Sequence, residues 1–139
     1  MNDREILLVE DNRDDEALTL DALSRAGVGN PVTVVRDGAE ALDYLFGKEN
    51  YAEKPCLVML DLKLPKIGGL EVLKRIRKNE QTKRVPVVVL TTSSEPEDLQ
   101  NAYDNGANGY VRKPVEFDRF SEAVRQLGMY WILVNESID

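Results

Sequence analysis

Carboxylate, hydroxyl and ammonium side chains follow four short apolar runs of this sequence. They are Glu10, Asp11, Asp61, Thr91 and Lys113. One acid after a buried strand is often only the point where the chain meets water, whereas five such groups at one edge would form a site. Clustered carboxylates repel one another and raise each other's pKa unless a cation lies among them. If the five side chains converge, they therefore predict a divalent metal site with a cationic side chain beside it.

The oxygen ligands of this group limit the choice of metal. The chain contains no histidine, and Cys56 stands at the opposite end of its apolar run from Asp61. Hard oxygen ligands favour Mg²⁺, with Mn²⁺ as the alternative, over zinc or copper. Lys113 and Thr91 suit an anion that completes the site, as an ammonium and a hydroxyl donor. An aspartate in such surroundings is able to attack phosphorus and form an aspartyl phosphate.

Short apolar runs that alternate with helical patterns must position these groups. The predicted strands are 6–9, 32–35, 57–60, 87–90 and 109–111, and the predicted helices are 14–26, from 37, 69–79, 97–105 and from 116. Strands separated by helices pair in parallel, and continuous Ile, Leu and Val runs are typical of a sheet covered on both faces. The pattern predicts a doubly wound α/β fold, in which ligands bind beyond the carboxyl ends of the strands. Four of the five strands deliver a candidate group to that edge.

Apolar spacing also predicts the apolar face of each helix. The predicted faces are Ala17, Leu20 and Leu23; Ala39, Leu42 and Phe46; Leu70, Leu73 and Ile76; and Leu99, Ala102 and Tyr103. In the last helix one stripe consists of Phe117, Phe120, Val124, Leu127, Trp131 and Val134. This stripe is predicted to face the sheet.

Length and charge limit the kinds of protein to consider. The chain has 139 residues, which suits one domain, and a net charge of −7. An excess of acids argues against nucleic acid as a partner, because such proteins need a basic face. No apolar run approaches the length of a membrane span or of a signal peptide, and there is one cysteine. We therefore expect a cytoplasmic protein with neither a nucleic acid nor a membrane as partner.

Five motifs in order give the chain a family resemblance. They are Glu10-Asp11, LDLKLP at 60–65, Gly68-Gly69, LTTS at 90–93 and GYVRKP at 109–114. With this pattern, residues 5 to about 128 resemble the CheY-like receiver domain of two-component response regulators. The resemblance implies a flavodoxin-like sheet of five parallel strands in the order 2-1-3-4-5. It also implies a receiver domain at 1–128, with 129–139 as a carboxyl-terminal helix extension and tail of the same domain.

The resemblance implies a phosphoacceptor switch rather than an enzyme that acts on outside substrates. Asp61 would accept a phosphoryl group from the phosphohistidine of a sensor histidine kinase, and the domain would catalyse its own phosphotransfer and slow autodephosphorylation. Asp11 and Asp61 would bind Mg²⁺ directly, together with the backbone carbonyl of Lys63, and Glu10 would act through a water. With no separate output domain expected, the signal would pass by protein contact.

Further positions match the phosphoryl-binding and switching residues of that family. Thr91, Thr92 and Lys113 would contact the phosphoryl oxygens, and the Lys113-Pro114 peptide bond should be cis. Tyr110 matches an aromatic residue that turns inward as the Thr91 hydroxyl moves towards the phosphoryl group. A tyrosine that caps the sheet edge would explain the same residue type.

Two peripheral segments point to a subfamily. The loop FGKENYAEKP at 46–55 and the end GMYWILVNESID at 128–139 look similar to the small regulators that accompany bacterial and cyanobacterial phytochromes. This similarity implies a phytochrome-type kinase as partner. The end is apolar nearly all round, and such a surface is seldom left in water. We expect it to form a homodimer interface, the alternative being that it folds back on the domain. The candidate interface residues are Met129, Tyr130, Ile132 and Leu133.

Three other interpretations account for part of this pattern. The main alternative is a phosphorylation-independent pseudo-receiver or scaffold, although every side chain needed for phosphorylation is present. A phosphohydrolase of related fold would have a second aspartate two residues after the nucleophile, where this chain has Lys63. A flavin-binding module needs a phosphate-cradling loop, and the acidic segment 10–15 would repel that phosphate. Lys63 suggests a further hypothesis, in which its ammonium shields a phosphoryl group on Asp61 from water and prolongs the phosphorylated state.

Overall fold

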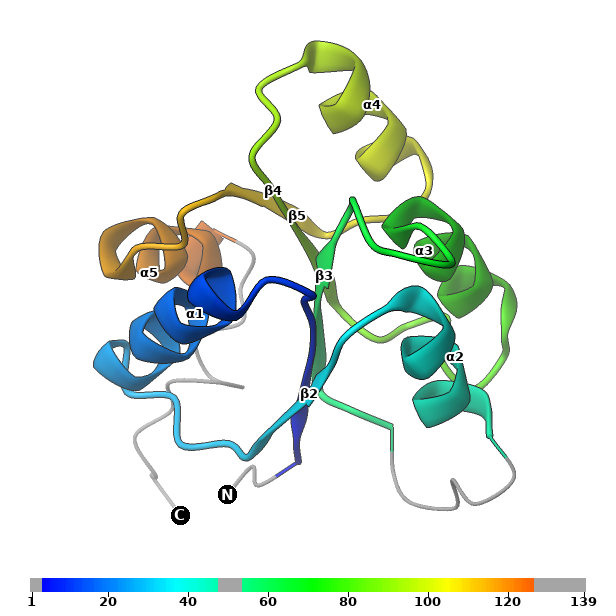
Figure 1. The fold of residues 1–139 in the computed structure, drawn as a ribbon, viewed down its shortest axis with the longest axis horizontal. Helices are drawn as coiled ribbons and strands as arrows, with labels where there is room; N and C mark the ends of the chain where they lie inside the picture. Colours follow the sequence, from blue (N-terminus) through cyan, green and yellow to red (C-terminus); the bar gives the residue numbers. More distant parts are fainter. Residues whose placement is uncertain (1–3, 48–53, 127–139) are drawn as a thin grey trace.

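The computed structural model describes residues 4–47 and 54–126, which form a parallel sheet with helices on both faces (Figure 1). The strands are β1 (Ile6–Val9), β2 (Val32–Val35), β3 (Leu57–Asp61), β4 (Val87–Thr91) and β5 (Gly109–Arg112). The helices are α1 (Arg13–Arg25), α2 (Gly38–Phe46), α3 (Gly69–Lys78), α4 (Pro96–Asp104) and α5 (Phe117–Gln126). Strands and helices therefore alternate along the chain as the apolar pattern predicts.

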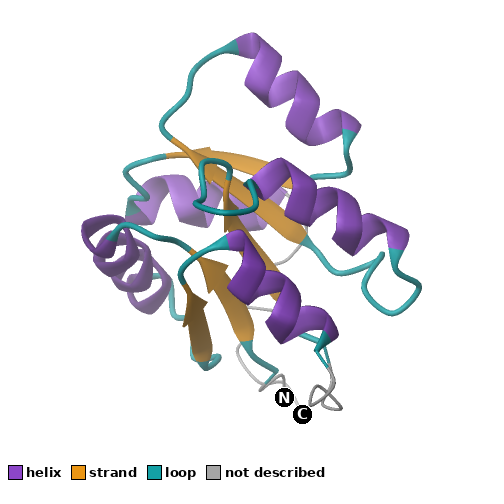
Figure 2. Cartoon of the chain, turned by 45° about the vertical axis from the view of Figure 1, so that its right-hand side comes forward, coloured by secondary structure: helices purple, strands orange, loops and turns teal. Residues whose placement is uncertain are grey.

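The five strands run in the order β2-β1-β3-β4-β5, and all four pairings are parallel. Helices α1 and α5 lie on one face of the sheet, and α2, α3 and α4 lie on the other (Figure 1). Figure 2 shows the strands in the middle layer with their helices on either side. The predicted doubly wound, flavodoxin-like fold with the order 2-1-3-4-5 is confirmed.

The alternation of side chains along the strands divides the core into two layers. Ile6 and Leu8 of β1 pack on the side of α1 and α5, where Phe120 of α5 is 1% exposed. Leu7 and Val9 pack on the opposite side, against α2 and α3. Every residue of β1, β3 and β4 is buried. The central strands are therefore a rigid support for whatever stands at their ends.

Strands β3 and β4 each run one residue further than the sequence pattern predicts. Asp61 is the last residue of β3 and pairs in register with Leu90, and Thr91 is the last residue of β4 and pairs with Arg112. Both side chains are buried. The predicted strands stopped before Asp61 and Thr91 because these residues are polar, whereas the hydrogen-bonded ladder continues through both. The backbone positions of Asp61 and Thr91 are therefore set by the sheet.

The predicted apolar face of α2 is confirmed at Leu42 and Phe46, which pack against the core. The fully buried residues of this helix are Gly38, Ala41 and Leu45, and the predicted trio of Ala39, Leu42 and Phe46 is half-buried. A Cβ on Gly38 would lie 2.0 Å from the carbonyl oxygen of Ile67, so the start of α2 packs directly against the loop before α3. A glycine contributes nothing to an apolar pattern, so this close contact could not be predicted from the sequence.

The predicted apolar face of α4 is mostly wrong. Only Ala102 of this face is buried, whereas Leu99 is 40% exposed and Tyr103 is 47% exposed. Helix α4 packs beside the edge strand β5, so it has less of the sheet to cover than α3 has. In α3, Leu73 and Ile76 are buried as predicted. In α1, Leu23 is buried as predicted, but Ala17 is exposed.

Several predictions concern segments outside the described residues. The candidate dimer residues Met129, Tyr130, Ile132 and Leu133 lie there, as do the last three members of the α5 stripe and most of the loop 46–55. Within α5, Phe120 and Val124 are buried as predicted, and Phe117 is 41% exposed. In the described part of the chain, no helix combines the length and the apolar character that crossing a membrane requires.

Candidate functional site

The predicted site residues converge at the carboxyl ends of four neighbouring strands. Glu10 follows β1, Asp61 ends β3, Thr91 ends β4 and Lys113 follows β5. Lys113 Nζ lies 3.0 Å from Asp61 Oδ2 and 2.8 Å from Glu10 Oε1, although these residues come from opposite ends of the chain. The structure therefore brings together the groups whose types suggested a metal and phosphoryl site.

A tight loop after β3 orients Asp61. The backbone N–H of Lys63 donates to Asp61 Oδ1 at 3.2 Å, and that of Gly69 donates to the carbonyl oxygen of Leu62 at 2.9 Å. A Cβ on Gly69 would lie 2.1 Å from the carbonyl oxygen of Asp61, so only glycine allows α3 to begin so close to the strand. Lys66 takes up a φ of 67° within this loop, in the left-handed region. The loop thus fixes the direction of the Asp61 carboxylate.

Lys113 is the cationic centre of the site. Its backbone N–H donates to the carbonyl oxygen of Thr91 at 2.7 Å, and its side chain is 6% exposed. Burial by itself disfavours the ammonium, but its hydrogen bonds to Glu10, Asp61 and Asp15 outweigh that effect and hold the pKa of Lys113 above its usual value. The side chain is therefore an ammonium throughout the physiological range. The peptide bond from Lys113 to Pro114 is cis, as the resemblance implies.

Glu10 is the most deeply buried acid of the cluster, with 0% exposure. Burial raises the pKa of Glu10 to about 7, and the negative charge of Asp61 adds to this effect, while the hydrogen bond from Lys113 opposes it. Glu10 Oε2 accepts a hydrogen bond from the backbone N–H of Asn12 at 3.2 Å. Glu10 Oε1 lies 2.8 Å from Lys113 Nζ but has no well-directed hydrogen bond. A buried carboxylate oxygen is thus left for another ligand.

The acidic cluster fits a hard divalent cation. One carboxylate oxygen from each of Glu10, Asp11 and Asp61 lies within 4.8 Å of the other two, with Glu10 and Asp61 buried and Asp11 exposed. Three oxygen donors that open to solvent on one side suit Mg²⁺ or Mn²⁺, which keep waters and bind only one or two carboxylates directly. The predicted ligands therefore lie close enough together to share one ion.

The hydroxyl groups of the site meet at Ser93. Thr91 is 1% exposed, and its Oγ1 accepts from the backbone N–H of Ser93 at 3.1 Å. The half-buried Tyr110 donates its hydroxyl to the carbonyl oxygen of the same residue at 3.2 Å. Thr92 and Lys63 are exposed, and in residues 4–47 and 54–126 neither side chain bonds to the cluster. Thr91 and Tyr110 are thus linked through one residue of the β4–α4 loop.

Asp15 also belongs to the cluster, although its position was not predicted from the sequence. This residue lies in the first turn of α1, and its Oδ2 is 3.0 Å from Lys113 Nζ, with 26% of the side chain exposed. The acidic segment 10–15 was the only signal available in the sequence. Which of its acids reaches Lys113 depends on how α1 is rotated against the sheet, and a tertiary arrangement of that kind leaves no local pattern.

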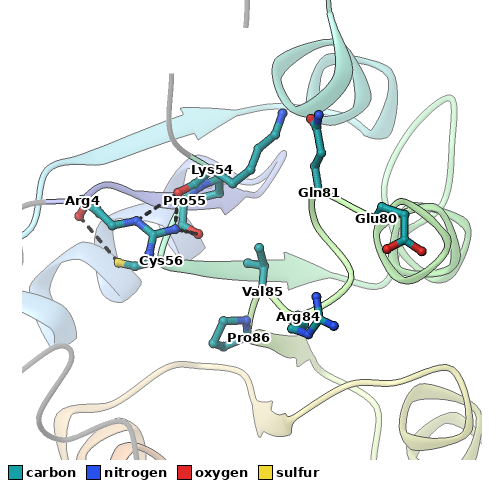
Figure 3. A pocket seen from close by; sticks show the side chains of 9 residues that line it. All are labelled: Arg4, Lys54, Pro55, Cys56, Glu80, Gln81, Arg84, Val85 and Pro86. Atoms are coloured by element: carbon teal, nitrogen blue, oxygen red, sulfur yellow. Dashed lines mark hydrogen bonds between the residues drawn. The ribbon is translucent and has the colours of Figure 1, made fainter. Parts of the chain in front are cut away.

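A separate hollow lies at the amino ends of the strands. It has a volume of about 400 Å³ and is lined by residues that precede β1, β3 and β4 (Figure 3). Arg4 in its wall donates hydrogen bonds to the carbonyl oxygens of Lys54 and Pro55, and Lys54 donates to that of Leu45. These cations hold the chain segment before β3, and this hollow is far from the acidic cluster.

Comparison with known proteins shows the family of the chain. A family model described as "Response regulator receiver domain" matches residues 6–125. The chain is 43% identical over 133 residues to the "Probable methanogenesis regulatory protein FilR2" of Methanothrix harundinacea, which covers 95% of this chain and 86% of that protein. It is 36% identical over 129 residues to the response regulator Rcp1 of Synechocystis, covering 91% of this chain and 88% of Rcp1.

Solved structures give the same result. The bacteriophytochrome response regulator RtBRR superposes with a TM-score of 0.85 at 48% identity, covering 98% of this chain and 84% of that one. The Mn²⁺-bound form of Rcp1 superposes with a TM-score of 0.76 at 35% identity, covering 93% and 94%. Both identities are high enough for the similarity to extend beyond the fold alone.

Proposed function

The chain belongs to the response regulator receiver domain family, and from this premise we propose that Asp61 accepts a phosphoryl group from the phosphohistidine of a sensor histidine kinase. The observation that carries the proposal is the position of Asp61 at the end of a buried strand, 3.0 Å from the ammonium of Lys113 and within 4.8 Å of two further carboxylates. An aspartate in this setting has a nucleophilic oxygen, a rigid support and a cation to stabilise an incoming phosphoryl group.

The reaction is a transfer between two atoms. An oxygen of Asp61 attacks phosphorus, the new O–P bond forms as the P–N bond breaks, and the departing imidazole nitrogen keeps the electron pair and takes up a proton. Lys113 neutralises charge on the phosphoryl oxygens. Mg²⁺, when bound, would supply further charge neutralisation and hold the phosphoryl group in line. Asp11, Asp61 and the backbone carbonyl of Lys63 would be its ligands, with Glu10 acting through a water.

Thr91 and Tyr110 are the proposed switch. Among residues 4–47 and 54–126, Thr91 Oγ1 accepts a hydrogen bond from Ser93 and donates none, which leaves its hydroxyl hydrogen for a phosphoryl oxygen. Movement of Thr91 would displace Ser93, whose carbonyl oxygen holds the hydroxyl of Tyr110. Inward rotation of Tyr110 would follow. Thr92, exposed beside Thr91, would contact the phosphoryl group at the mouth of the site.

The partner class is also part of the proposal. We infer a phytochrome-type histidine kinase, supported by the 48% identity to a bacteriophytochrome response regulator and by the relationship to Rcp1. FilR2 is named for the regulation of methanogenesis, so kinase identity has to be tested directly. Mg²⁺ and a kinase supplied with ATP are both found in the cytoplasm, where we place the reaction.

We further propose that residues 129–139 extend the receiver domain of residues 1–128 and form a homodimer interface.

The test is phosphotransfer from a phosphorylated histidine kinase in the presence of Mg²⁺. Wild type and Asp14→Asn should become labelled, and Asp61→Asn should not. Asp14 is a suitable control because it is an exposed acid four residues after Glu10. Loss of label over time, without kinase, would measure the proposed slow autodephosphorylation. A protein that binds its partner equally well without label would instead be a pseudo-receiver or scaffold.

A further inference from the structure

The ammonium of Lys113 has no donor left for a phosphoryl oxygen. A lysine ammonium has three N–H donors. In this structure Lys113 Nζ donates hydrogen bonds to three separate carboxylates, at 3.1 Å to Glu10 Oε2, 3.0 Å to Asp61 Oδ2 and 3.0 Å to Asp15 Oδ2. The proposed function requires the same ammonium to bind a phosphoryl oxygen once Asp61 is modified. One of the three carboxylates must therefore leave.

Asp15 is the carboxylate that can leave most easily. The Glu10 side chain is 0% exposed and that of Asp61 is 7% exposed, so neither can move into water, and Asp61 is itself the acceptor. The Asp15 side chain is 26% exposed and sits on a helix surface. Partly exposed ion pairs contribute little stability, because solvent screens them and competes for both partners. Rotation of Asp15 towards solvent would cost less than any other rearrangement around Lys113.

The backbone at Asp15 holds the side chain close to Lys113 without depending on that ion pair. The N–H of Asp15 donates to the side chain of the N-cap residue Asn12 at 2.9 Å, and its carbonyl oxygen accepts from the Thr19 hydroxyl at 2.8 Å. Both bonds are made by main-chain atoms. The side chain can therefore release Lys113 while the first turn of α1 stays in place.

We propose that Asp15 is a positioning residue that occupies Lys113 in the unphosphorylated protein and competes with the phosphoryl group for its ammonium. This inference rests on the proposed function of Asp61. Asp15 takes the place of the anion at Lys113 before phosphorylation, and its own negative charge repels the incoming phosphoryl group. Replacing the carboxylate with a neutral amide frees one donor of Lys113 and removes that repulsion.

The test measures binding of beryllium fluoride, a non-transferable phosphoryl mimic, in saturating Mg²⁺ by ¹⁹F NMR or calorimetry. Asp15→Asn should bind it roughly three- to tenfold more tightly than wild type, the range expected for losing a partly exposed ion-pair competitor. Asp14→Asn is the matched control, since it removes the same charge from an exposed acid in the same helical turn. Its affinity should stay close to that of wild type. Asp15→Glu, which keeps a carboxylate, should return towards the wild-type affinity.

Mg²⁺ affinity, measured without beryllium fluoride, separates competition from a structural role. Asp15→Asn should bind Mg²⁺ no more tightly than Asp14→Asn, because removing an acid cannot attract a cation. Loosening of the site would weaken the binding of both Mg²⁺ and beryllium fluoride, whereas removal of a competitor strengthens the binding of beryllium fluoride alone. If wild type binds beryllium fluoride and Asp15→Asn binds it equally or more weakly, the inference is overturned. Asp15→Ser replaces Asp15→Asn in this test if the amide variant does not fold. Absence of binding by wild type and Asp14→Asn would overturn the proposed function, and this inference with it.

Discussion

Replacing Lys113 with methionine should expose how strongly the acidic cluster depends on one cation. The Lys113 side chain is 6% exposed, and that of its partner Glu10 is 0% exposed. Removing one partner of a buried ion pair leaves an uncompensated charge, which costs about 3 to 5 kcal/mol. The pair with Asp15 is partly solvated, since 26% of that side chain is exposed, so we expect the lower end, about 3 kcal/mol at pH 8 without Mg²⁺.

The loss should depend on pH because of Glu10. Its pKa is raised to about 7 from 4.5, and the hydrogen bond from Lys113 opposes this rise. An acid whose pKa is raised by folding contributes stability that is present below the unfolded value and is lost as pH rises through the folded value. In Lys113→Met the opposing bond is gone, so the difference from wild type should be largest near pH 8 and smallest near pH 4.5. Mg²⁺ at pH 8 should restore part of the stability.

Urea denaturation at both pH values, with and without Mg²⁺, measures these differences. Lys66→Met is the matched control, because the Lys66 side chain is 68% exposed and lies 3.4 Å from its partner Asp37. We expect that variant to lose less than about 1 kcal/mol. If Lys113→Met proves as stable as Lys66→Met at pH 8 without Mg²⁺, the cluster does not depend on Lys113 and the electrostatic argument fails.

Three further predictions concern the loop, the metal and the lifetime of the phosphorylated state. In thermal unfolding, Gly69→Ala should destabilise the protein by about 2 kcal/mol or more, because its Cβ would lie 2.1 Å from the Asp61 carbonyl oxygen. Gly68→Ala is the control and should be tolerated, because its Cβ would lie 3.9 Å from its nearest neighbour. Mg²⁺ affinity should fall as pH drops below about 7, because Glu10, whose pKa is raised to about 7, takes up a proton that the cation must displace. Calorimetric titrations that show no such fall would exclude Glu10 from the metal site. Lys63→Asn should lose its phosphoryl group faster than wild type in a dephosphorylation time course, and an unchanged or slower rate would remove the shielding hypothesis.

The strands and the site were predictable because their signals are local. Apolar runs gave all five strands, although the run of β5 is short, and each candidate group stood at or within two residues of the end of its run, so parallel pairing brings them to one edge. Asp61 was assigned correctly to that edge, although the ladder continues through it. The sequence pattern could identify these positions because the sheet sets the backbone position of a residue at or just after a strand end.

The missed and misplaced residues depend on tertiary packing. Asp15 reaches Lys113 because of how α1 is rotated on the sheet, and no spacing along the chain encodes that rotation. The close approach of Gly38 to Ile67 at the start of α2 is a backbone contact that an apolar pattern does not register. In α4 the apolar Leu99 stays exposed because the helix lies at the edge of the sheet. Apolar spacing therefore identified the helices better than it identified their orientation.

The central claim is that Asp61 is the phosphoryl acceptor, and mass spectrometry of the protein after reaction with a phosphorylated histidine kinase and Mg²⁺ tests it most directly. We predict one added phosphoryl group, recovered on the peptide that contains Asp61 after trapping of the acyl phosphate, and none on Asp61→Asn. Modification of Asp61→Asn to the same extent as wild type, or a phosphoryl group found on another residue of the wild-type chain, would contradict this account.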